Sequence, residues 1–330
     1  MIISRTPLRI SFVGGGTDIR EYYQREPGGV LSTSIDKYIY VAVKRQLSFV
    51  DYKYRVNWSQ TEFKNNIEDI EHPIVRETLK MLEIDFPVEI TTFADVPAGT
   101  GLGSSSTFAV GLLNALYALK GERISKGELA NQAAKIEIDI LKRNMGKQDH
   151  FAAAYGNVNV FRFFEDETTS VEPVFYKPEI KEEIQNRLLM FYTDKKRDAS
   201  KILKEQIKNT SDKFEVLTKM KSLIPNLNDV FNDKNGMNNF GDILHQGWVL
   251  KRSIASTISN RQINQYYERA QKAGAIGGKL LGAGGGGFLL FYAEKHNHDR
   301  IKAELRDLTE MKFKFDDAGT RITYYDQRIS

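Results

Sequence analysis

A stretch that combines glycines with hydroxyl side chains reads PAGTGLGSSSTFAVGLL and runs from Pro97 to Leu113. Gly99, Gly101 and Gly103 allow backbone conformations that other residues rarely adopt, and Ser104 to Thr107 then open a segment with one apolar helical face. Unpaired amide groups and the dipole at the start of such a helix attract an anion. The stretch therefore indicates a phosphate-binding loop, although a glycine-rich turn with a serine N-cap would show the same pattern.

Familiar phosphate-loop patterns do not match this stretch. A Walker loop ends in Gly-Lys-Ser/Thr, whereas no lysine lies between Asp95 and Leu119. The dinucleotide pattern requires a third glycine at the place where Ser104 stands. Val41 to Lys44 resembles the lysine strand of protein kinases, but the chain has no His-Arg-Asp or Asp-Phe-Gly triplet, so we interpret this segment as a strand.

Two further glycine clusters could also place the backbone against a ligand. PLRISFVGGGTD, from Pro7 to Asp18, exposes amides beside a carboxylate, which suits a polyol, and a tight strand-to-loop turn is the alternative. KLLGAGGGGFLL, from Lys279 to Leu290, contains four consecutive glycines, each costing roughly 0.5–1 kcal/mol relative to alanine. Its backbone must lie close to a ligand or to another segment, and packing between domains would meet that need equally well.

Two carboxylates lie between these clusters. Glu137 has mainly apolar neighbours three and four positions away on a predicted helix, so its charge needs a cation or a donor. Magnesium is one candidate and a neighbouring basic residue is the other. Asp149 precedes a short apolar run, where it is either a helix N-cap or a proton acceptor on a loop.

The composition limits the class of protein. The chain has 330 residues, 41% of them hydrophobic, and a net charge of +4 that is too small and too evenly spread to favour nucleic acid. The absence of cysteine excludes disulfides, zinc–cysteine sites and thiol nucleophiles, and favours a reducing compartment. The N-terminus lacks the apolar region of a signal peptide, and no apolar run is long enough to cross a membrane, so we expect a cytoplasmic protein.

The elements that must position these residues follow from periodicity. We predict strands at Leu8 to Val13, Tyr38 to Val43, Tyr52 to Trp58, Val88 to Phe93, Gly287 to Tyr292 and Arg321 to Tyr325. We predict helices at Thr107 to Leu119 and Glu128 to Lys142, the second with a capping box formed by Ser125 and Glu128. Strands and helices together predict an α+β protein. The chain becomes more polar and helical in pattern near residue 185, which predicts a domain boundary there.

The three glycine motifs, in this order and at these separations, resemble those of the GHMP kinases, a superfamily named for galactokinase, homoserine kinase, mevalonate kinase and phosphomevalonate kinase. The resemblance covers nearly the whole chain. It implies a two-domain fold with a mixed-sheet domain at 1–185, similar to a domain of a ribosomal protein, and a ferredoxin-like α/β sandwich at 186–330. It also implies that ATP and Mg²⁺ bind at an active site between the domains.

The resemblance further implies roles for residues at matching positions. Asp149 would accept the proton of the substrate hydroxyl, and Arg9 would neutralise charge on the transferred phosphoryl group. Mg²⁺ would be held by Ser105 and Glu137. The ATP phosphates would be wrapped by Pro97, Gly99, Gly101, Leu102, Gly103, Ser104, Ser105 and Ser106. The substrate would be contacted by Gly15, Gly16, Thr17, Asp18, Lys147, Arg197, Gly284 and Gly285.

The first motif narrows the substrate. Galactokinases have Gly-Glu-His-Thr-Asp where this chain has Gly-Gly-Gly-Thr-Asp at 14–18, which argues against galactose. PLRISFVGGGTDI, with SIDKY at 34–38 and FYT at 191–193, more closely resembles the D-glycero-D-manno-heptose 7-phosphate kinases, which are similar to the kinase part of fucokinases. That branch phosphorylates the anomeric C1 hydroxyl and needs a cationic pocket for the distal phosphate, for which the candidates are Arg20, Arg25, Lys37, Lys147 and Arg197.

Two other functions fit the same residues. One is a different anomeric sugar kinase, such as a fucose kinase. The other is a non-catalytic relative that binds ATP or sugar as a regulator, although the presence of both Glu137 and Asp149 weighs against it. In each case we expect a small-molecule ligand, no nucleic acid or membrane partner, and a monomer or homodimer.

Overall fold

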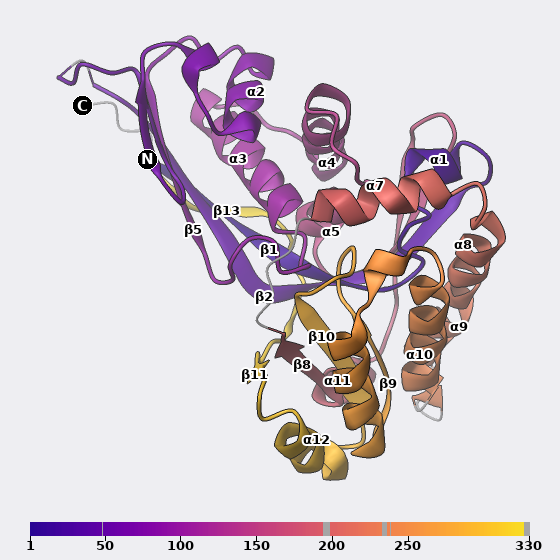
Figure 1. The fold of residues 1–330 in the computed structure, drawn as a ribbon. Helices are drawn as coiled ribbons and strands as arrows, with labels where there is room; N and C mark the ends of the chain where they lie inside the picture. Colours follow the sequence, from indigo (N-terminus) through magenta and orange to yellow (C-terminus); the bar gives the residue numbers. More distant parts are fainter. Residues whose placement is uncertain (48, 194–198, 233–235, 238, 327–330) are drawn as a thin grey trace.

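The computed structural model describes residues 1–47, 49–193, 199–232, 236–237 and 239–326. In these residues the chain forms two sheets, one of nine strands and one of four, with helices packed against both (Figure 1). The chain thus contains both sheets and helices, and the prediction of an α+β protein is confirmed.

The nine-stranded sheet is organised around one long strand, β2 (Gly28–Arg45), which is buried along its first eight residues. One end of β2 pairs with β6 (Val158–Phe163) and the other with β5 (Val88–Ala94). Along its length β2 also pairs antiparallel with β1 (Ile2–Val13). The remaining strands of this sheet are β3 (Tyr54–Asn57), β4 (Thr61–Lys64), β7 (Thr169–Pro173), β12 (Phe315–Asp316) and β13 (Arg321–Tyr325).

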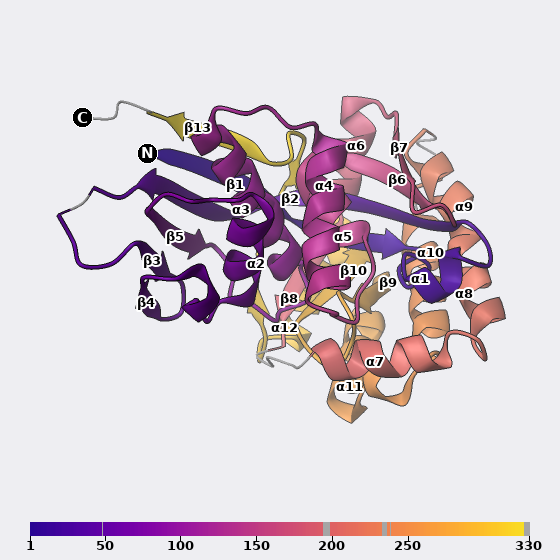
Figure 2. The same ribbon diagram turned by 90° about the horizontal axis from the view of Figure 1, so that it is seen from above.

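Helix α3 (Ser104–Lys120) crosses β1 and β2 and is buried on nearly all sides. It begins after Gly103 and ends at Gly121, both with a backbone φ of +78°, and so starts three residues before the predicted Thr107. Its Gly111 allows the close approach, since a Cβ there would lie 2.7 Å from Thr6 Oγ1. Figure 2 shows the helices that lie beside α3, namely α2 (Pro73–Met81), α4 (Lys126–Ala134) and α5 (Gln148–Tyr155).

The predicted helix from Glu128 to Lys142 is interrupted in the structure. Its capping box between Ser125 and Glu128 is confirmed, but α4 ends at Ala134 and a π-helix follows at Lys135–Ile140. The wider turn places the side chains of both Ile136 and Glu137 in the interior. Such π-turns occur often at functional sites.

The four-stranded sheet is antiparallel, in the order β11 (Thr309–Glu310), β8 (Leu188–Tyr192), β10 (Phe288–Ala293) and β9 (Ala275–Leu280). The rings of Trp248, Tyr267 and Phe291 pack together behind it. Helix α1 (Arg20–Tyr23) lies between β1 and β2 along the chain. The helices that accompany the smaller sheet or connect it to the larger one are α6 (Pro178–Asn186), α7 (Ala199–Asn209), α8 (Phe214–Lys221), α9 (Leu223–Val230), α10 (Asn239–Arg252), α11 (Arg261–Lys272) and α12 (His298–Glu304).

The chain's last strands return to the larger sheet. β13 pairs with β1, and the backbone amide of Asp326 donates to the carbonyl of Met1 over 2.9 Å. A division after residue 185 therefore falls in the last turn of α6, and β12 and β13 beyond it still belong to the first sheet. The two parts share one core, because the Phe240 ring contacts Phe12 of β1 and Tyr292 of β10. Among the described residues, no helix is long and apolar enough to span a membrane.

Candidate active site

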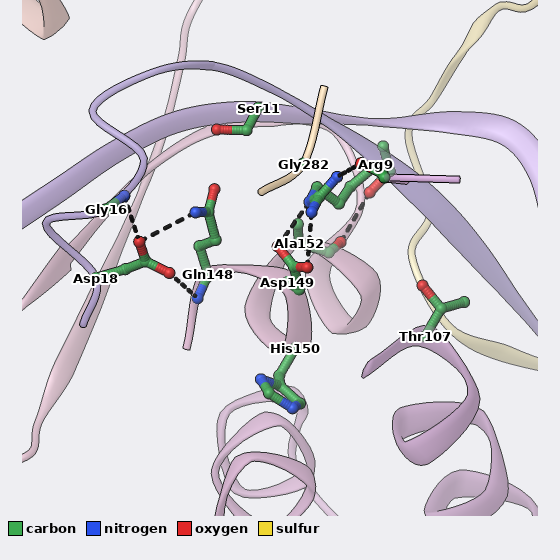
Figure 3. A network of polar contacts seen from close by, with 12 residues as sticks. Arg9, Ser11, Gly16, Asp18, Thr107, Gln148, Asp149, His150, Ala152 and Gly282 are labelled. Atoms are coloured by element: carbon green, nitrogen blue, oxygen red, sulfur yellow. Dashed lines mark hydrogen bonds and ion pairs between the residues drawn. The ribbon is translucent and has the colours of Figure 1, made fainter. Parts of the chain in front are cut away.

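Arg9 and Asp149 form the most tightly defined pair in the site. The Arg9 Nε lies 2.6 Å from Asp149 Oδ1 and its Nη2 lies 2.7 Å from Oδ2, a bidentate arrangement that Figure 3 shows. Arg9 Nη1 also donates to the Gly101 carbonyl over 2.8 Å. The guanidinium therefore joins β1, the glycine–serine loop and α5 at one point, and only 5% of the Arg9 side chain is exposed.

Asp149 is not the N-cap of α5. Lys147 stands at that position, and Asp149 lies in the first helical turn with its carboxylate held by Arg9. The side chain of Asp149 keeps 17% of its surface exposed, so an entering ligand can reach it. Of the two alternatives drawn from the sequence, the capping role is therefore wrong.

The glycine–serine loop has the geometry of an anion site. Gly99, Gly101 and Gly103 have φ values of +79°, +89° and +78°, and no side chain caps the start of α3. The amides at this helix start remain available to a ligand, and the helix dipole adds a partial positive charge. The loop is anchored by Leu102, which is buried and whose carbonyl accepts the Arg9 amide over 3.1 Å.

A cavity of about 220 Å³ lies between this loop, the first glycine cluster and the C-terminal elements. Helix α7 contributes Leu203 and Gln206 to its wall. The predicted site residues that line it are Arg9, Gly15, Gly16, Asp18, Gly99, Gly101, Gly103, Ser104, Ser105, Ser106 and Asp149. The three sequence motifs that are far apart in the chain thus meet at one cavity, since Gly282 and Ala283 of the third motif line it as well.

Asp18 is buried beside Gln148. Its carboxylate accepts the Gly16 amide over 2.9 Å, the Gln148 amide over 3.2 Å and the Gln148 side-chain nitrogen over 3.1 Å (Figure 3). Gly146 makes room for it, since a Cβ there would lie 2.0 Å from Asp18 Oδ2. Burial and then the nearby Asp149 charge raise the pKa of Asp18, although the backbone hydrogen bonds oppose the shift.

Some polar atoms in the cavity wall have no protein partner. Among the described residues, Ser11 Oγ and Gln148 Oε1 are buried without a hydrogen bond, and both residues line the cavity next to Gly15. Leaving such atoms unsatisfied costs about 1–3 kcal/mol each, so they are groups that a polar ligand would satisfy. This wall therefore suits a ligand rich in hydroxyls.

Glu137 is fully buried with three polar partners. His150 Nε2 lies 2.9 Å from Oε2, while Ser105 Oγ and Arg143 Nη1 both contact Oε1, the latter at 2.5 Å. Burial alone would raise the pKa of Glu137, but the hydrogen bonds from His150 and Ser105 and the Arg143 charge outweigh it and lower the pKa. The second partner that the sequence suggested for Glu137, a neighbouring basic residue, is thus present in Arg143.

The donor set at Ser105 and Glu137 fits magnesium. Mg²⁺ takes oxygen ligands and is usually held by one or two carboxylates together with substrate phosphates and water. A hydroxyl and a carboxylate oxygen meet here at the start of α3, next to the anion site. In the described part of the chain, no cluster of three or more acidic, histidine or cysteine side chains could hold a metal. Any ion at Glu137 would therefore need further ligands, such as nucleotide phosphates or water.

Several residues expected to contact ligands lie elsewhere. Thr17 is fully buried and its hydroxyl contacts the carbonyls of Gly14 and Gly29, so it shapes the loop. Lys147 points to Glu167, with its ammonium in contact with the carboxylate, and Pro97 lies outside the cavity lining. Arg197 is outside the described residues.

The third glycine cluster serves packing at most of its positions. Gly284 lies against Ile258, and the Gly285 amide donates to the Ile258 carbonyl over 2.8 Å, so neither lines the cavity. Gly287 lies against the phosphate loop, since a Cβ there would be 2.2 Å from the Thr100 carbonyl oxygen. Close packing between the two parts of the chain is therefore what these glycines allow.

Of the five cations proposed for a distal phosphate, the four that the structure describes already have partners. Arg20 contacts Asp139 and Glu167, Lys37 contacts Asp36, and Arg25 lies over the Phe214 ring. The cavity instead presents two lysines that sequence reasoning missed, Lys251 and Lys279. Lys279 opens the third glycine motif and Lys251 belongs to no motif, and each becomes part of the site only through tertiary packing.

Lys279 is a buried lysine at the cavity wall. Its Nζ donates to the carbonyls of Ser11 and Phe12 over 2.8 and 2.7 Å, which ties β9 to β1. Burial, followed by repulsion from Arg9, lowers the pKa of Lys279 to about 7. Lys251, at the end of α10, contacts the Gly282 carbonyl and so holds the glycine loop.

Two family models match the chain. The model of the GHMP kinase N-terminal domain matches residues 73–157 and that of the C-terminal domain matches residues 223–309. Together the two ranges cover more than half of the chain. A D-glycero-alpha-D-manno-heptose 7-phosphate kinase of Campylobacter jejuni is 29% identical over 92% of both chains.

Two further relatives extend the comparison. The bifunctional fucokinase/GDP-fucose pyrophosphorylase of Arabidopsis thaliana is 26% identical over 94% of this chain, which spans about a third of that protein. A crystal structure of a D-glycero-D-manno-heptose 1-phosphate kinase from Bacteroides thetaiotaomicron superimposes with a TM-score of 0.80. It covers 99% of this chain and all of its own, at 24% identity, and so shows the fold.

The fold and the site together define an ATP-dependent phosphotransferase with its cavity between two α/β parts. The chain belongs to the GHMP kinases, and its similarity to heptose phosphate kinases and fucokinases places it among the sugar kinases of that family.

Proposed function

We propose that this enzyme transfers the γ-phosphoryl group of ATP to the anomeric C1 hydroxyl of D-glycero-D-manno-heptose 7-phosphate. The product would be the 1,7-bisphosphate, a precursor of nucleotide-activated heptose. The observation that carries the proposal is the relative from Campylobacter jejuni, which is similar along nearly the whole of both chains. The cavity supports it, because Asp18, Ser11 and Gln148 form a polar wall for a polyol.

Asp149 is the proton acceptor in this mechanism. Its carboxylate lines the cavity together with the phosphate loop and Asp18, so a sugar bound at the polar wall could present a hydroxyl to it. Arg9 keeps the carboxylate in one orientation through two hydrogen bonds. A loose phosphoryl transition state needs mainly positioning and charge stabilisation, which the α3 helix start and Arg9 supply.

Ser105 and Glu137 are the residues that would hold Mg²⁺ in the proposed enzyme. The ion, when bound, would neutralise charge on the nucleotide phosphates. Around that position the chain's own groups do the orienting, since His150 fixes the second oxygen of Glu137 over 2.9 Å. We propose a cytoplasmic enzyme that acts as a monomer or homodimer on a small-molecule sugar phosphate.

The distal phosphate of the substrate needs a cation that reaches the cavity. Lys251 lines both the main cavity and its small extension toward Thr210 and Leu217. We therefore favour this end of α10 for the distal phosphate over Arg20 and Lys147, which do not line the cavity.

A coupled ADP-release assay tests the substrate. The acceptors are heptose 7-phosphate, heptose 1-phosphate, unphosphorylated heptose, fucose and galactose, with Asp149→Asn as the inactive control. We expect the highest kcat/KM for heptose 7-phosphate, and phosphorus NMR should show a new phosphate on C1. A preference for fucose would establish the fucokinase alternative, and turnover with none of the sugars together with intact ATP binding would favour a regulator.

A further inference from the structure

Arg143 bridges the two groups that fit a metal ion. Its Nη1 lies 2.5 Å from Glu137 Oε1 and 2.6 Å from Ser105 Oγ, so one nitrogen contacts both oxygens. The Arg143 backbone amide also donates to the Glu137 carbonyl over 2.9 Å, which fixes the turn that carries the side chain. The contact is therefore a defined feature of the region next to the phosphate loop.

This guanidinium and a divalent cation exclude each other. An ion coordinated by Ser105 and Glu137 would stand about 2.0–2.1 Å from the same two oxygens that the Arg143 nitrogen contacts. Two positive centres would then share one small space between two oxygens. Because repulsion between such centres is strong in a partly buried site, only one of them can occupy it at a time.

The Arg143 side chain can move away from this contact, whereas the Glu137 side chain cannot. The Arg143 side chain is 35% exposed, so its charged end can move into solvent or onto a phosphate. Glu137 is fully buried and its other oxygen stays in contact with His150, which is also fully buried. Departure of the guanidinium would therefore free Ser105 Oγ and one Glu137 oxygen without disturbing the carboxylate's position.

We propose that Arg143 is a resident cation that competes with the divalent metal for Ser105 and Glu137. In the nucleotide-free enzyme it holds both side chains in the geometry that the metal needs and balances the buried charge of Glu137. When the metal–nucleotide complex binds, it moves aside, and the metal concentration needed for binding is raised in consequence. Arg143 is thus a positioning residue, and the inference depends on the metal position proposed above but not on the identity of the sugar.

Direct measurement of metal binding tests this competition. The probe is Mn²⁺, whose free concentration is followed by electron paramagnetic resonance while it is added to the enzyme with saturating ADP. Arg143→Ala should bind Mn²⁺ more tightly, by roughly tenfold, which is the effect of removing one charge-assisted competitor. In the absence of any divalent ion the same variant should bind ADP more weakly than the wild type, because a cation near the phosphates is lost.

Matched variants make the outcome decisive. Arg143→Met keeps the apolar stem and should behave as Arg143→Ala does, and it carries the test if the alanine variant fails to fold. Arg162→Ala removes an arginine of similar exposure that pairs with Glu172 on the far strands β6 and β7, and it should leave Mn²⁺ affinity unchanged. Unchanged or weaker Mn²⁺ binding in the Arg143 variants, or an equal gain in Arg162→Ala, would overturn the inference. A wild-type enzyme that binds no Mn²⁺ with ADP would instead contradict the metal position itself.

Discussion

Arg9 and Asp149 face each other across the cavity floor with two parallel contacts of 2.6 and 2.7 Å, joining the first strand of the chain to the fifth helix. The same guanidinium also donates to the Gly101 carbonyl of the phosphate loop over 2.8 Å. A single side chain therefore sets the distance between the carboxylate and the loop that would bind the nucleotide. Several consequences can be measured.

Asp149→Asn should lower kcat by about 10²–10⁴-fold, because an amide cannot accept the hydroxyl proton. ATP binding should remain, since the loop amides that would hold the phosphates are unchanged. Asp139→Asn is the matched control, because it removes the same charge from an exposed residue paired with Arg20. Steady-state kinetics and nucleotide titration provide both readings, and near-normal turnover in Asp149→Asn would refute the proposed role.

The Arg9–Asp149 pair should also show thermodynamic coupling. Arg9→Met and Asp149→Asn each leave one member of a largely buried ion pair without its partner, which costs on the order of 3 kcal/mol. In the double variant neither charge remains, so the loss of stability should be smaller than the sum of the single losses by about 1–3 kcal/mol. Urea unfolding of the four proteins measures this, and additive effects would show that the two side chains act independently.

Gly287→Ala should impair both stability and ATP use. Gly287 has a φ of +104°, and its added Cβ would lie 2.2 Å from the Thr100 carbonyl oxygen, so the phosphate loop would be pushed away. Gly121→Ala is the control that introduces backbone strain without a new steric contact, because Gly121 has a φ of +78° and nothing lies within 4 Å of the added Cβ. It should cost about 1–2 kcal/mol with no change in KM for ATP. Equal effects of the two substitutions on KM would contradict the role of Gly287.

Sequence reasoning identified the residue types of the site but not every direction in which they point. Glycine and serine patterns predicted the phosphate loop, and the buried Glu137 followed from its apolar helical neighbours. The family resemblance implied ligand contacts for Thr17 and Lys147, whose side chains instead turn toward backbone carbonyls and Glu167. A linear pattern gives the residue and its element, while side-chain direction is decided by packing against distant segments.

Tertiary packing also explains what the sequence left out. Lys279 becomes part of the site because β9 brings it against the carbonyls at the end of β1, more than 250 positions earlier in the chain. The π-helix at Lys135–Ile140 contains no glycine or proline, so its residues predict an uninterrupted α-helix. The return of β12 and β13 to the first sheet depends on pairing between the two ends of the chain.

Lys279→Met should change how stability depends on pH. The folded pKa of Lys279 is about 7, whereas that of an unfolded lysine is about 10.4, so between these values the unfolded chain binds more protons. The free energy of unfolding of the wild type should therefore rise with pH across this range, because the penalty for burying a charge is complete below pH 7 and gone above pH 10.4. Methionine cannot titrate, so the variant lacks this slope.

The difference between variant and wild type isolates that contribution. The variant should have its greatest relative stability near pH 6 and lose on the order of 4 kcal/mol of that advantage by pH 10, according to the size of the shift. Its two lost hydrogen bonds, each worth about 1 kcal/mol, lower its stability at every pH and leave the slope unaffected. Urea unfolding from pH 6 to pH 10 measures the difference, with Lys295→Met, an exposed lysine paired with Glu183, as control. If the difference in unfolding free energy between variant and wild type stays constant across this range, Lys279 is not a buried group that titrates there. The contact between β9 and β1 would then have to be stabilised by other interactions.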